Sequence, residues 1–418
     1  MKVHRNCCGL DVHKQTIAAC LIREDSRGNS VKEKRIFGTM TQQLRELAQW
    51  LAEAKVSAVA MEATGVYWVP VWNVLEGEGL HLVLINPEHY KAVRGKKTDL
   101  KDGERIAELL QDGRLEGSYV PPRELRVLRD LTRYRIKLVE HQCSIACRIQ
   151  KLLEQCNIKL GSVASNVLGV SGTAMLHALA QGESNPERLA DMAKMQLRRK
   201  LPALRLALDG YLLPHQRFLL GEMLEELSYS RNKIARLEAE IELQMQPFQK
   251  ALQAWMNMPG IKQRVAWTLV AEIGPDMQAF PSAAHLASWV GVCPGNHESA
   301  GKRQSGKSRK GNRWARHALC EAAWAVTKTK NTYLAAQFRR LAAARGMKRA
   351  VIAVAHTIVT TGYHLLQRGT VYADLGPNYF DQRHKLRTTK RLVKRLEALG
   401  HKVVLDSPLP SPLTPAGA

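Results

Sequence analysis

Hydrophobic periodicity changes once along this chain, and that change limits its fold more than any other feature. Up to about residue 120, short apolar runs alternate with helical stretches and turn residues, a pattern typical of a mixed α/β sheet. From about residue 123, apolar residues recur at spacings of three and four, which predicts helices. The sequence therefore predicts an α/β unit followed by mainly helical regions.

The elements of the first part can be placed individually. Strands are predicted over 3–12, 16–23, 31–38, 56–62 and 81–87, and helices over 41–54 and 66–79. The second helix contains Pro70, which lacks the N–H that a helix interior needs. Three strands followed by strands and helices in alternation indicate one mixed sheet with helices packed on it.

The predicted domains follow this division. They are an α/β domain over 1–122, a helical linker and coiled-coil region over 123–250, a C-terminal domain over 251–400 and a disordered, Pro-rich tail over 401–418. Heptad a and d positions are assigned to Leu220, Met223, Leu227, Ile234, Leu237 and Ile241, with Ser230 and Gln244 interrupting the seam. This pattern fits a helical hairpin or a dimeric coiled coil, and both remain open.

The charge balance points to a polyanionic partner. Lys and Arg number 62 against 38 Asp and Glu, giving a net charge of +24 and a pI near 9.9. Such an excess favours nucleic acid before a membrane surface. No long apolar run predicts a transmembrane helix or a signal peptide, so a cytosolic protein is expected. The eight cysteines form no C-x-x-C pair, which favours reduced thiols over a zinc site or disulfides.

Four carboxylates stand near the ends of predicted strands. Asp11 lies where the first strand ends, Glu62 ends the fourth, and Asp99 and Asp102 open the helix after the fifth. Asp99 and Asp102 are three residues apart and therefore project from one helix face. Oxygen ligands of this kind hold Mg²⁺, and a pair of ions roughly 3.5–4 Å apart assists phosphodiester cleavage. The four acids are candidate metal ligands.

Each acid also has a structural explanation. Asp11 can close a strand turn, while Asp99 and Asp102 can stabilise a helix start as N-cap and N3 residues. Glu62 lies in the apolar segment AVAMEATG, where an unpaired buried carboxylate is costly, and it is the hardest to explain structurally.

Basic residues cluster in the second half of the chain. Residues 301–316 contain Gly, Lys and Arg without an acid, which suits close contact with a phosphate chain or a solvated loop. Residues 256–274 resemble a helix-hairpin-helix, although a simple turn before a helix fits equally well. The candidate nucleic-acid contacts are Arg129, Arg133, Lys137, Lys262, Lys302, Arg303, Lys307, Arg309, Lys310 and Arg313.

Several segments together carry a family resemblance. They are LDVHK at Asp11, MEATGVYW at Glu62, INP at 85–87, KTDLKDGERIAELL at Asp99 and Asp102, GVSG at 169–172, MPGI, GVCPGNHESAGKRQSGKSRKGN and LCEAAWA. In this order they resemble the DEDD transposases of the insertion-sequence-110 type, a group that includes the Piv-like DNA invertases. The segment CPGNHESAGK resembles most closely the subgroup of the family that has the motif CPGNxESAGK. One departure is Gly103, where the family more often has Ala.

The resemblance implies a fold and a mechanism. The N-terminal domain is expected to be RNase H-like, similar to the RuvC resolvase, and to hold Mg²⁺ or Mn²⁺ through Asp11, Glu62, Asp99 and Asp102. The family's nucleophilic serine, which forms a phosphoserine link to DNA, falls at Ser299 by its spacing from Pro294. Ser305 is the competing candidate, because the family often has Gly directly after the serine and Gly306 follows Ser305.

The resemblance also implies partners. Members act on donor and target DNA as dimers that pair into tetramers, and some use a structured non-coding bridge RNA as a guide. The expected place of action is the prokaryotic cytoplasm, at the nucleoid. Two other functions remain open: a RuvC-like two-metal nuclease without a covalent step, and a non-enzymatic basic nucleic-acid-binding protein.

Overall fold

The computed structural model describes residues 3–24, 29–86, 99–295, 297–299, 302–305, 308 and 310–405. For residues 99, 100, 297–299 and 302–305 only the backbone is described. The chain divides into two compact units, Met1–Pro121 and Pro122–Ala418. A further boundary near residue 250 stays a prediction, and the tail from residue 406 onward lies outside the described residues. None of the described helices is both long enough and apolar enough to span a membrane.

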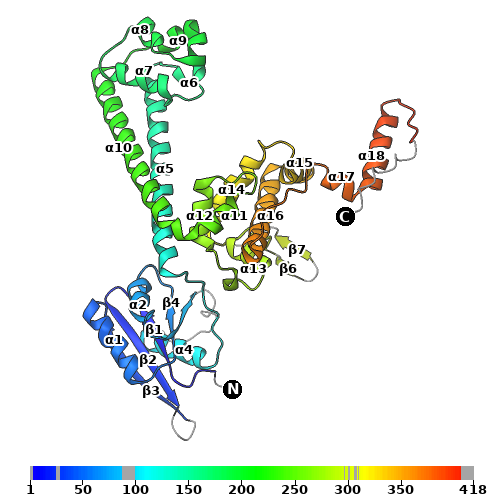
Figure 1. The fold of residues 1–418 in the computed structure, drawn as a ribbon. Coiled ribbons are helices and arrows are strands. Elements are labelled where there is room, and N and C mark those ends of the chain that lie inside the picture. Colours follow the sequence, from blue (N-terminus) through cyan, green and yellow to red (C-terminus); the bar gives the residue numbers. More distant parts are fainter. Residues whose placement is uncertain are drawn as a thin grey trace, which may run out of the picture. The chain divides into compact units, whose positions relative to one another are not determined.

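The first unit is a five-stranded mixed sheet with helices on both faces (Figure 1). Its elements are β1 (Cys7–Val12), β2 (Thr16–Glu24), β3 (Ser30–Gly38), α1 (Thr41–Glu53), β4 (Ala58–Glu62), α2 (Trp68–Leu75), β5 (His81–Ile85) and α4 (Asp99–Gln111). The strand order is β3-β2-β1-β4-β5. Strands β1, β2 and β3 are antiparallel neighbours, whereas β4 and β5 join β1 in parallel. All five predicted strands and the two predicted helices occur in the predicted order along the chain, although the first strand begins at Cys7 and not at residue 3.

Alternation along β1 and β4 divides the core between the two faces of the sheet. Leu10 on β1 and Met61 on β4 pack with α1 and α2 in one apolar cluster. Cys7 on β1 and Ala60 on β4 pack with Ile106 and neighbouring residues of α4 in another. Because successive strand residues point to opposite faces, every second residue after Cys7 and Ala60 points towards α4.

The edges of the elements follow local chemistry. Helix α2 is shorter than predicted because it begins at Trp68, which puts Pro70 in the first turn, where no helical N–H is required.

Strand β3 is an edge strand with a charged face. Its Lys32 donates to Glu104 and Glu108 on α4, and Lys34 donates to Glu104 at 2.6 Å. These ion pairs attach α4 to the edge strand.

The second unit begins with two long helices, α5 (Arg123–Gln155) and α10 (Pro214–Gln244), which form a hairpin within one chain (Figure 1). His141 pairs with Glu226 at 2.8 Å and Arg135 with Glu238 at 2.7 Å, so the helices run antiparallel. The predicted seam on α10 differs in detail. Leu224 is buried there, whereas Met223 is only partly buried.

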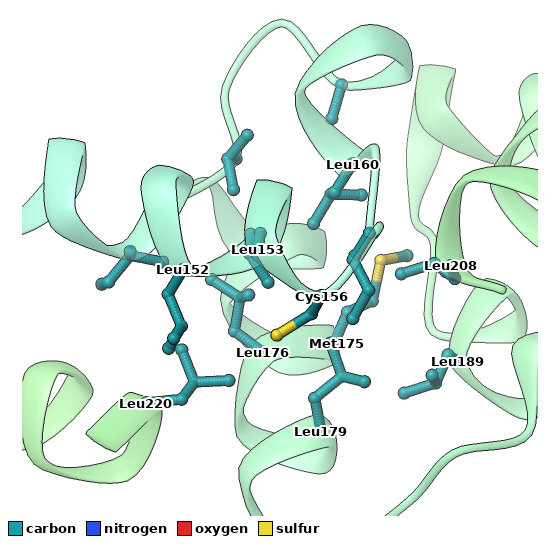
Figure 2. Packing of buried hydrophobic residues seen from close by; sticks show 14 of the residues in the cluster. Leu152, Leu153, Cys156, Leu160, Met175, Leu176, Leu179, Leu189, Leu208 and Leu220 are labelled. Carbon is teal, nitrogen blue, oxygen red and sulfur yellow. The ribbon is translucent and has the colours of Figure 1, made fainter. Parts of the chain in front are cut away.

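Short helices between α5 and α10 enclose a separate apolar cluster. They are α6 (Leu160–Val163), α7 (Val170–Ala180), α8 (Pro186–Asp191), the 3₁₀ helix η1 (Met195–Lys200) and α9 (Leu201–Leu208). Figure 2 shows Leu153, Cys156, Leu176 and Leu208 converging in this cluster. All eight cysteines of the chain are free thiols, and Cys143 and Cys147 are exposed.

The remaining elements form a helical region around a buried tryptophan. They are η2 (Gln246–Phe248), α11 (Gln249–Met256), α12 (Gln263–Ile273), η3 (Met277–Ala279), α13 (Ala283–Val290), β6 (His297–Ser299), β7 (Lys302–Ser305), α14 (Arg313–Val326), α15 (Tyr333–Arg345), α16 (Met347–Arg368), α17 (Tyr379–Arg383) and α18 (Lys385–Ala398). Trp255 on α11 is fully buried, and a Cβ at Gly362 on α16 would lie 2.2 Å from its ring. Glycine there lets the indole lie against the α16 backbone.

Candidate active site

Asp11 and Glu62 are the buried carboxylates at the ends of two adjacent parallel strands. The β1–β4 register pairs Leu10 with Met61, so the next residue on each strand is one of these acids. Alternation from Cys7 and Ala60 points both side chains towards the face that α4 covers. Asp11 is 6 % exposed and Glu62 is 8 % exposed. The fold therefore brings together two of the four predicted ligands.

The surroundings of Asp11 disfavour its charge. Burial raises the pKa of the Asp11 carboxyl, and the negative charges of Glu62 and Asp102 raise it further, while the neighbouring His13 acts in the opposite direction. His13 Nε2 lies 3.2 Å from Asp11 Oδ2. The Thr64 hydroxyl donates to Glu62 Oε1 at 2.6 Å. Sequence reasoning assigned no role to His13 or Thr64, although both lie inside the LDVHK and MEATG segments.

Helix α4 supplies the other two acids from its first turn. Asp102 is half-buried and contributes to the electrostatic field at Asp11, so three of the predicted ligands lie near one another. Asp99 begins the helix as predicted, and its side chain lies outside the described residues. Among the described side chains, no three His, Cys, Asp or Glu are grouped closely enough to hold a metal ion.

Two glycines set how closely α4 approaches the sheet. A Cβ at Gly9 on β1 would lie 2.3 Å from the Gly103 carbonyl oxygen and 2.4 Å from the Ala107 nitrogen. A Cβ at Gly103 would lie 2.8 Å from the Ala18 carbonyl oxygen on β2. All these neighbours are backbone atoms, which cannot swing aside. Gly103, the departure from the family's usual Ala, therefore lets the helix that carries Asp102 pack against the strands.

Replacing Gly9 with alanine is expected to destabilise the first unit by about 1–3 kcal/mol, the usual cost of overpacking. The measurement is hydrogen exchange of the β1 and α4 amides in the full chain, followed by mass spectrometry. Gly77→Ala is the matched control, because a Cβ at Gly77 meets nothing within 4 Å. Equal protection in the two variants would contradict the close packing of α4.

The predicted nucleophile lies on a short β-hairpin. Strands β6 and β7 pair Ser299 with Lys302, and a bridge between Pro294 and Ser308 closes the base of the segment. We call residues 297–305 the serine hairpin. Ser299 ends its first strand, next to the connection, and Ser305 pairs with His297 near the base. The side chains of both serines lie outside the described residues, so the choice between them stays a prediction.

Sequence analysis missed a buried carboxylate that links α5, α12 and the start of α14. Glu272 on α12 is fully buried and accepts two hydrogen bonds from Arg133, at 2.7 and 2.8 Å. It also accepts one from Asn312 Nδ2 at 2.7 Å. Asn312 in turn caps α14 by accepting from the Trp314 and Ala315 amides. The only sequence signal was one acid inside the apolar run VAWTLVAEIG.

Arg129 belongs to the same network. It donates to the main-chain carbonyls of Ala271, at 3.0 Å, and of Glu272, and its side chain is 12 % exposed. Arg129 and Arg133 were predicted to contact nucleic acid. Arg129 is largely buried and Arg133 is 34 % exposed, and both pair with the buried Glu272 carboxylate, which requires cationic partners. Contact with nucleic acid stays a prediction for both. Their charges serve to join α5 to α12 and α14.

Glu272→Gln is expected to destabilise the second unit by about 3 kcal/mol, since it removes the counter-charge of the largely buried Arg129 and the partly exposed Arg133. Urea unfolding of the full chain, with exchange protection read on α5, α12 and α14, measures the loss. Glu140→Gln is the control, because Glu140 pairs with the exposed Lys137 and is expected to contribute below about 1 kcal/mol. Similar losses in the two variants would show that Glu272 is not an anchor.

The side chains of only some of the other predicted nucleic-acid contacts are described. Lys262, Lys310 and Arg313 are exposed. Only the backbone of Lys302 and Arg303 is described, and Lys307 and Arg309 lie outside the described residues. The turn before α12 packs against α14, where a Cβ at Gly260 would lie 2.5 Å from the Ala322 carbonyl oxygen. Close packing therefore accounts for this glycine, and the choice between a helix-hairpin-helix and a simple turn stays open.

Trp314 is surrounded by cations. Arg313, Lys137 and Arg133 lie 4.5, 5.6 and 5.7 Å from the centre of its ring. The tryptophan is half-buried at the start of α14, a few residues after the serine hairpin. An aromatic ring among Lys and Arg side chains is a common feature of nucleic-acid surfaces.

Two family models match separate parts of the chain. A DEDD transposase model of the IS110 type matches residues 8–158, and the model of the transposase IS116/IS110/IS902 family matches residues 252–339. A probable family 20 transposase of Pseudomonas aeruginosa is 27 % identical over 276 residues, which cover 65 % of this chain and 71 % of that protein. An uncharacterized 43.6 kDa protein of the insertion element IS110 from Streptomyces coelicolor is 30 % identical over 145 residues, 34 % of this chain and 35 % of that protein.

The first model covers the sheet with Asp11, Glu62 and Asp102 and continues through α5. The second covers the region from α11 into α15, including the hairpin with Ser299. The chain therefore belongs to the IS110 family of transposases, enzymes that cut DNA strands and transfer them to new positions.

Proposed function

We propose that this transposase excises and inserts its own mobile element by combining a carboxylate metal site with a serine nucleophile. The observation that carries the proposal is the burial of Asp11 and Glu62 side by side at the ends of β1 and β4, with Asp102 close enough to affect the charge of Asp11. The strand order β3-β2-β1-β4-β5 supports an RNase H-like fold for this unit. Without a bound cation, this grouping of Asp11, Glu62 and Asp102 places like charges close together with no evident benefit to stability.

The residues fit a divalent cation. Asp11, Glu62, Asp99 and Asp102 offer the hard oxygen donors that Mg²⁺ or Mn²⁺ prefers. Burial raises the pKa of the Asp11 carboxyl, and the negative charges of Glu62 and Asp102 raise it further, so a bound cation would offset the cost of its charge. When bound, the cation supplies positive charge to the phosphodiester that is cut. His13 and Thr64 would position the carboxylates through their hydrogen bonds.

The serine supplies the covalent step. Ser299 Oγ forms a bond to phosphorus, the bond from phosphorus to a sugar oxygen breaks, and the serine proton is balanced by the proton that the leaving sugar hydroxyl takes up. A sugar hydroxyl of another strand then attacks the phosphoserine, which restores the serine and joins the strands. The serine belongs to the second compact unit, so the proposal requires that a DNA-bound assembly bring it to the carboxylates of this or another subunit.

The partners proposed are donor DNA, target DNA and a structured guide RNA. The net charge of +24 suits two nucleic acids, and an RNA guide leaves little base reading for the protein itself. A dimer that pairs into a tetramer would hold two duplexes at once. The exposed Lys262, Lys310 and Arg313 are proposed phosphate contacts in this assembly, together with the basic residues of the serine hairpin and those directly after it.

One experiment tests the function as a whole. The protein, purified with its bound nucleic acid, is incubated in Mg²⁺ with DNA containing both flanks of its gene, and the products are sequenced. Joined strands at the element ends are expected, and treatment with ribonuclease should abolish joining. Cut but unjoined DNA, unaffected by ribonuclease, would favour a two-metal nuclease instead.

A further inference from the structure

A cavity of about 1080 Å³ lies in the second unit, between helices α15 and α16 and the base of the serine hairpin. Pro294 and Ser308, the two residues whose bridge closes the segment that carries Ser299, form one wall. Ligand cavities usually measure roughly 300–1,000 Å³, so this one has room for a nucleotide. Neither the carboxylate site nor the buried Glu272 network uses it. We call it the Gln337 cavity.

The wall formed by the two helices has an unfilled hydrogen-bonding group. Gln337 donates from Nε2 to the Thr357 hydroxyl at 2.8 Å, while its Oε1 is buried without a partner. Turning the amide over would exchange the two atoms and still leave one of them unpaired. Buried polar atoms are nearly always paired in native proteins, so this oxygen requires a partner that an ordered water or a ligand would supply.

His356 lies next to Thr357 in the same wall. Burial lowers the pKa of its imidazole, so the ring is neutral at neutral pH and offers one donor and one acceptor. Neutral amide and imidazole groups suit the edge of a nucleobase, which also presents neutral donors and acceptors. The apolar remainder of the wall, which includes Leu341 and Ile352, suits the flat face of the base.

The mouth of the cavity is basic. Arg345, Lys348 and Arg349, at the turn between α15 and α16, line it and are exposed. No acidic residue is among the described residues that line the cavity. The sequence from 299 to 373 contains a single acid, Glu321, among many Lys and Arg. A fitting ligand would therefore carry a phosphate, which would lie at the mouth, and a ring with hydrogen-bonding groups, which would lie inside the cavity.

We propose that the Gln337 cavity binds an unstacked nucleotide of the DNA strand that Ser299 attacks, with the base inside and its phosphate at the basic mouth. The inference rests on the proposed function, because only that function brings a DNA strand to the serine hairpin. DNA is favoured over RNA because the hairpin that meets the strand to be cut also closes the cavity. Holding a base beside the hairpin would fix the strand in register for attack.

Binding is measured on the full-length Ser299→Ala protein in EDTA, so no cleavage is needed. The probe is a 12-nucleotide single-stranded DNA with one 2-aminopurine, whose fluorescence rises when the base is unstacked, and an RNA of the same sequence is compared. Gln337→Leu, which keeps the side-chain volume, is expected to weaken DNA binding about tenfold and to abolish the fluorescence rise. Thr357→Val, a subtler change, is expected to have a smaller effect in the same direction.

Charge and position are tested separately. The triple variant of Arg345, Lys348 and Arg349 to Ala is expected to reduce the salt dependence of binding, whereas Arg339→Ala, on α15 outside the cavity, should not. Photo-crosslinks from a 5-iodouracil in the probe are expected in the peptides spanning 337–357. Unchanged affinity in Gln337→Leu and Thr357→Val, or crosslinks confined to other peptides, would overturn the proposal. RNA bound tenfold more tightly than DNA would overturn the choice of strand.

Failure of this inference can be told apart from failure of the proposed function. The binding measurements use no metal and no nucleophile, whereas the function is tested by strand joining in Mg²⁺. Suppose that the wild-type protein joins strands and that the Gln337→Leu protein binds the probe normally. This result would reject the proposed binding in the cavity and leave the proposed function intact.

Discussion

Replacing Asp11 with asparagine is expected to lower DNA cleavage by roughly 10³-fold or more while leaving the chain folded, with an unchanged or higher unfolding temperature. A bound cation contributes several kcal/mol to the stabilisation of transition-state charge, and an amide in place of the carboxylate would hold that cation only weakly. The same amide removes a buried negative charge that is repelled by Glu62 and Asp102. Activity and stability therefore move in opposite directions. Cleavage of element-end DNA in Mg²⁺ and calorimetric unfolding of the full chain measure the two effects.

The matched control is Glu104→Gln, which removes an acid from the same helix as Asp102. Glu104 pairs with Lys32 and Lys34 on the edge strand, outside the proposed metal site. This variant is expected to keep its cleavage activity and to lose a small amount of stability, since these ion pairs are partly exposed. If Asp11→Asn cut DNA at the normal rate, Asp11 would not be a ligand and the metal site would have to be abandoned.

Changing Ser299 to alanine is expected to eliminate the covalent protein–DNA adduct and with it all strand joining. The hydroxyl is the atom that would bond to phosphorus, so no other feature of the side chain can replace it. The assay uses radiolabelled DNA from the element ends, incubated with the full-length protein in Mg²⁺ and separated on a denaturing gel. Wild-type protein should carry label, and mass spectrometry should place the modification on the peptide that contains Ser299.

Ser305→Ala serves as the control on the same hairpin. Ser305 pairs with His297 near the base, whereas Ser299 ends its strand beside the connection, so the two changes affect different positions of one small element. The Ser305 variant should form the adduct normally. An adduct that survives in Ser299→Ala and disappears in Ser305→Ala would reassign the nucleophile. Cleavage without any adduct in the wild-type protein would support a nuclease that uses water.

The order of elements in the first unit could be predicted because its signals are local. Five apolar runs of strand length, separated by turns and helical stretches, gave five strands and their connecting helices. The same apolar runs place Asp11 one residue before the end of its strand and Glu62 at the end of its strand. Helix boundaries were less certain, as α2 shows, because Pro70 is compatible with a first turn but not with a helix interior.

Interactions between distant segments could not be predicted. Glu272 and Arg133 are separated by 139 residues, and no local pattern marks them as partners. An amphipathic basic helix looks the same whether its arginines face phosphate or a buried acid, so the pairing of Arg129 and Arg133 with Glu272 could not be predicted. The Gln337 cavity likewise depends on two helices meeting a hairpin whose base lies about 40 residues earlier in the sequence.

The sequence by itself determined the fold class, the family and the chemical types of the site residues, because periodicity and motif spacing are properties of neighbouring residues. The tertiary structure decided which side chains share a space. It placed Asp11 and Glu62 on one face of the sheet, used Gly9 and Gly103 to bring Asp102 towards them, and paired two arginines with Glu272. The physical reason is that burial, electrostatic repulsion and backbone contact depend on distances in space, which only the folded chain fixes.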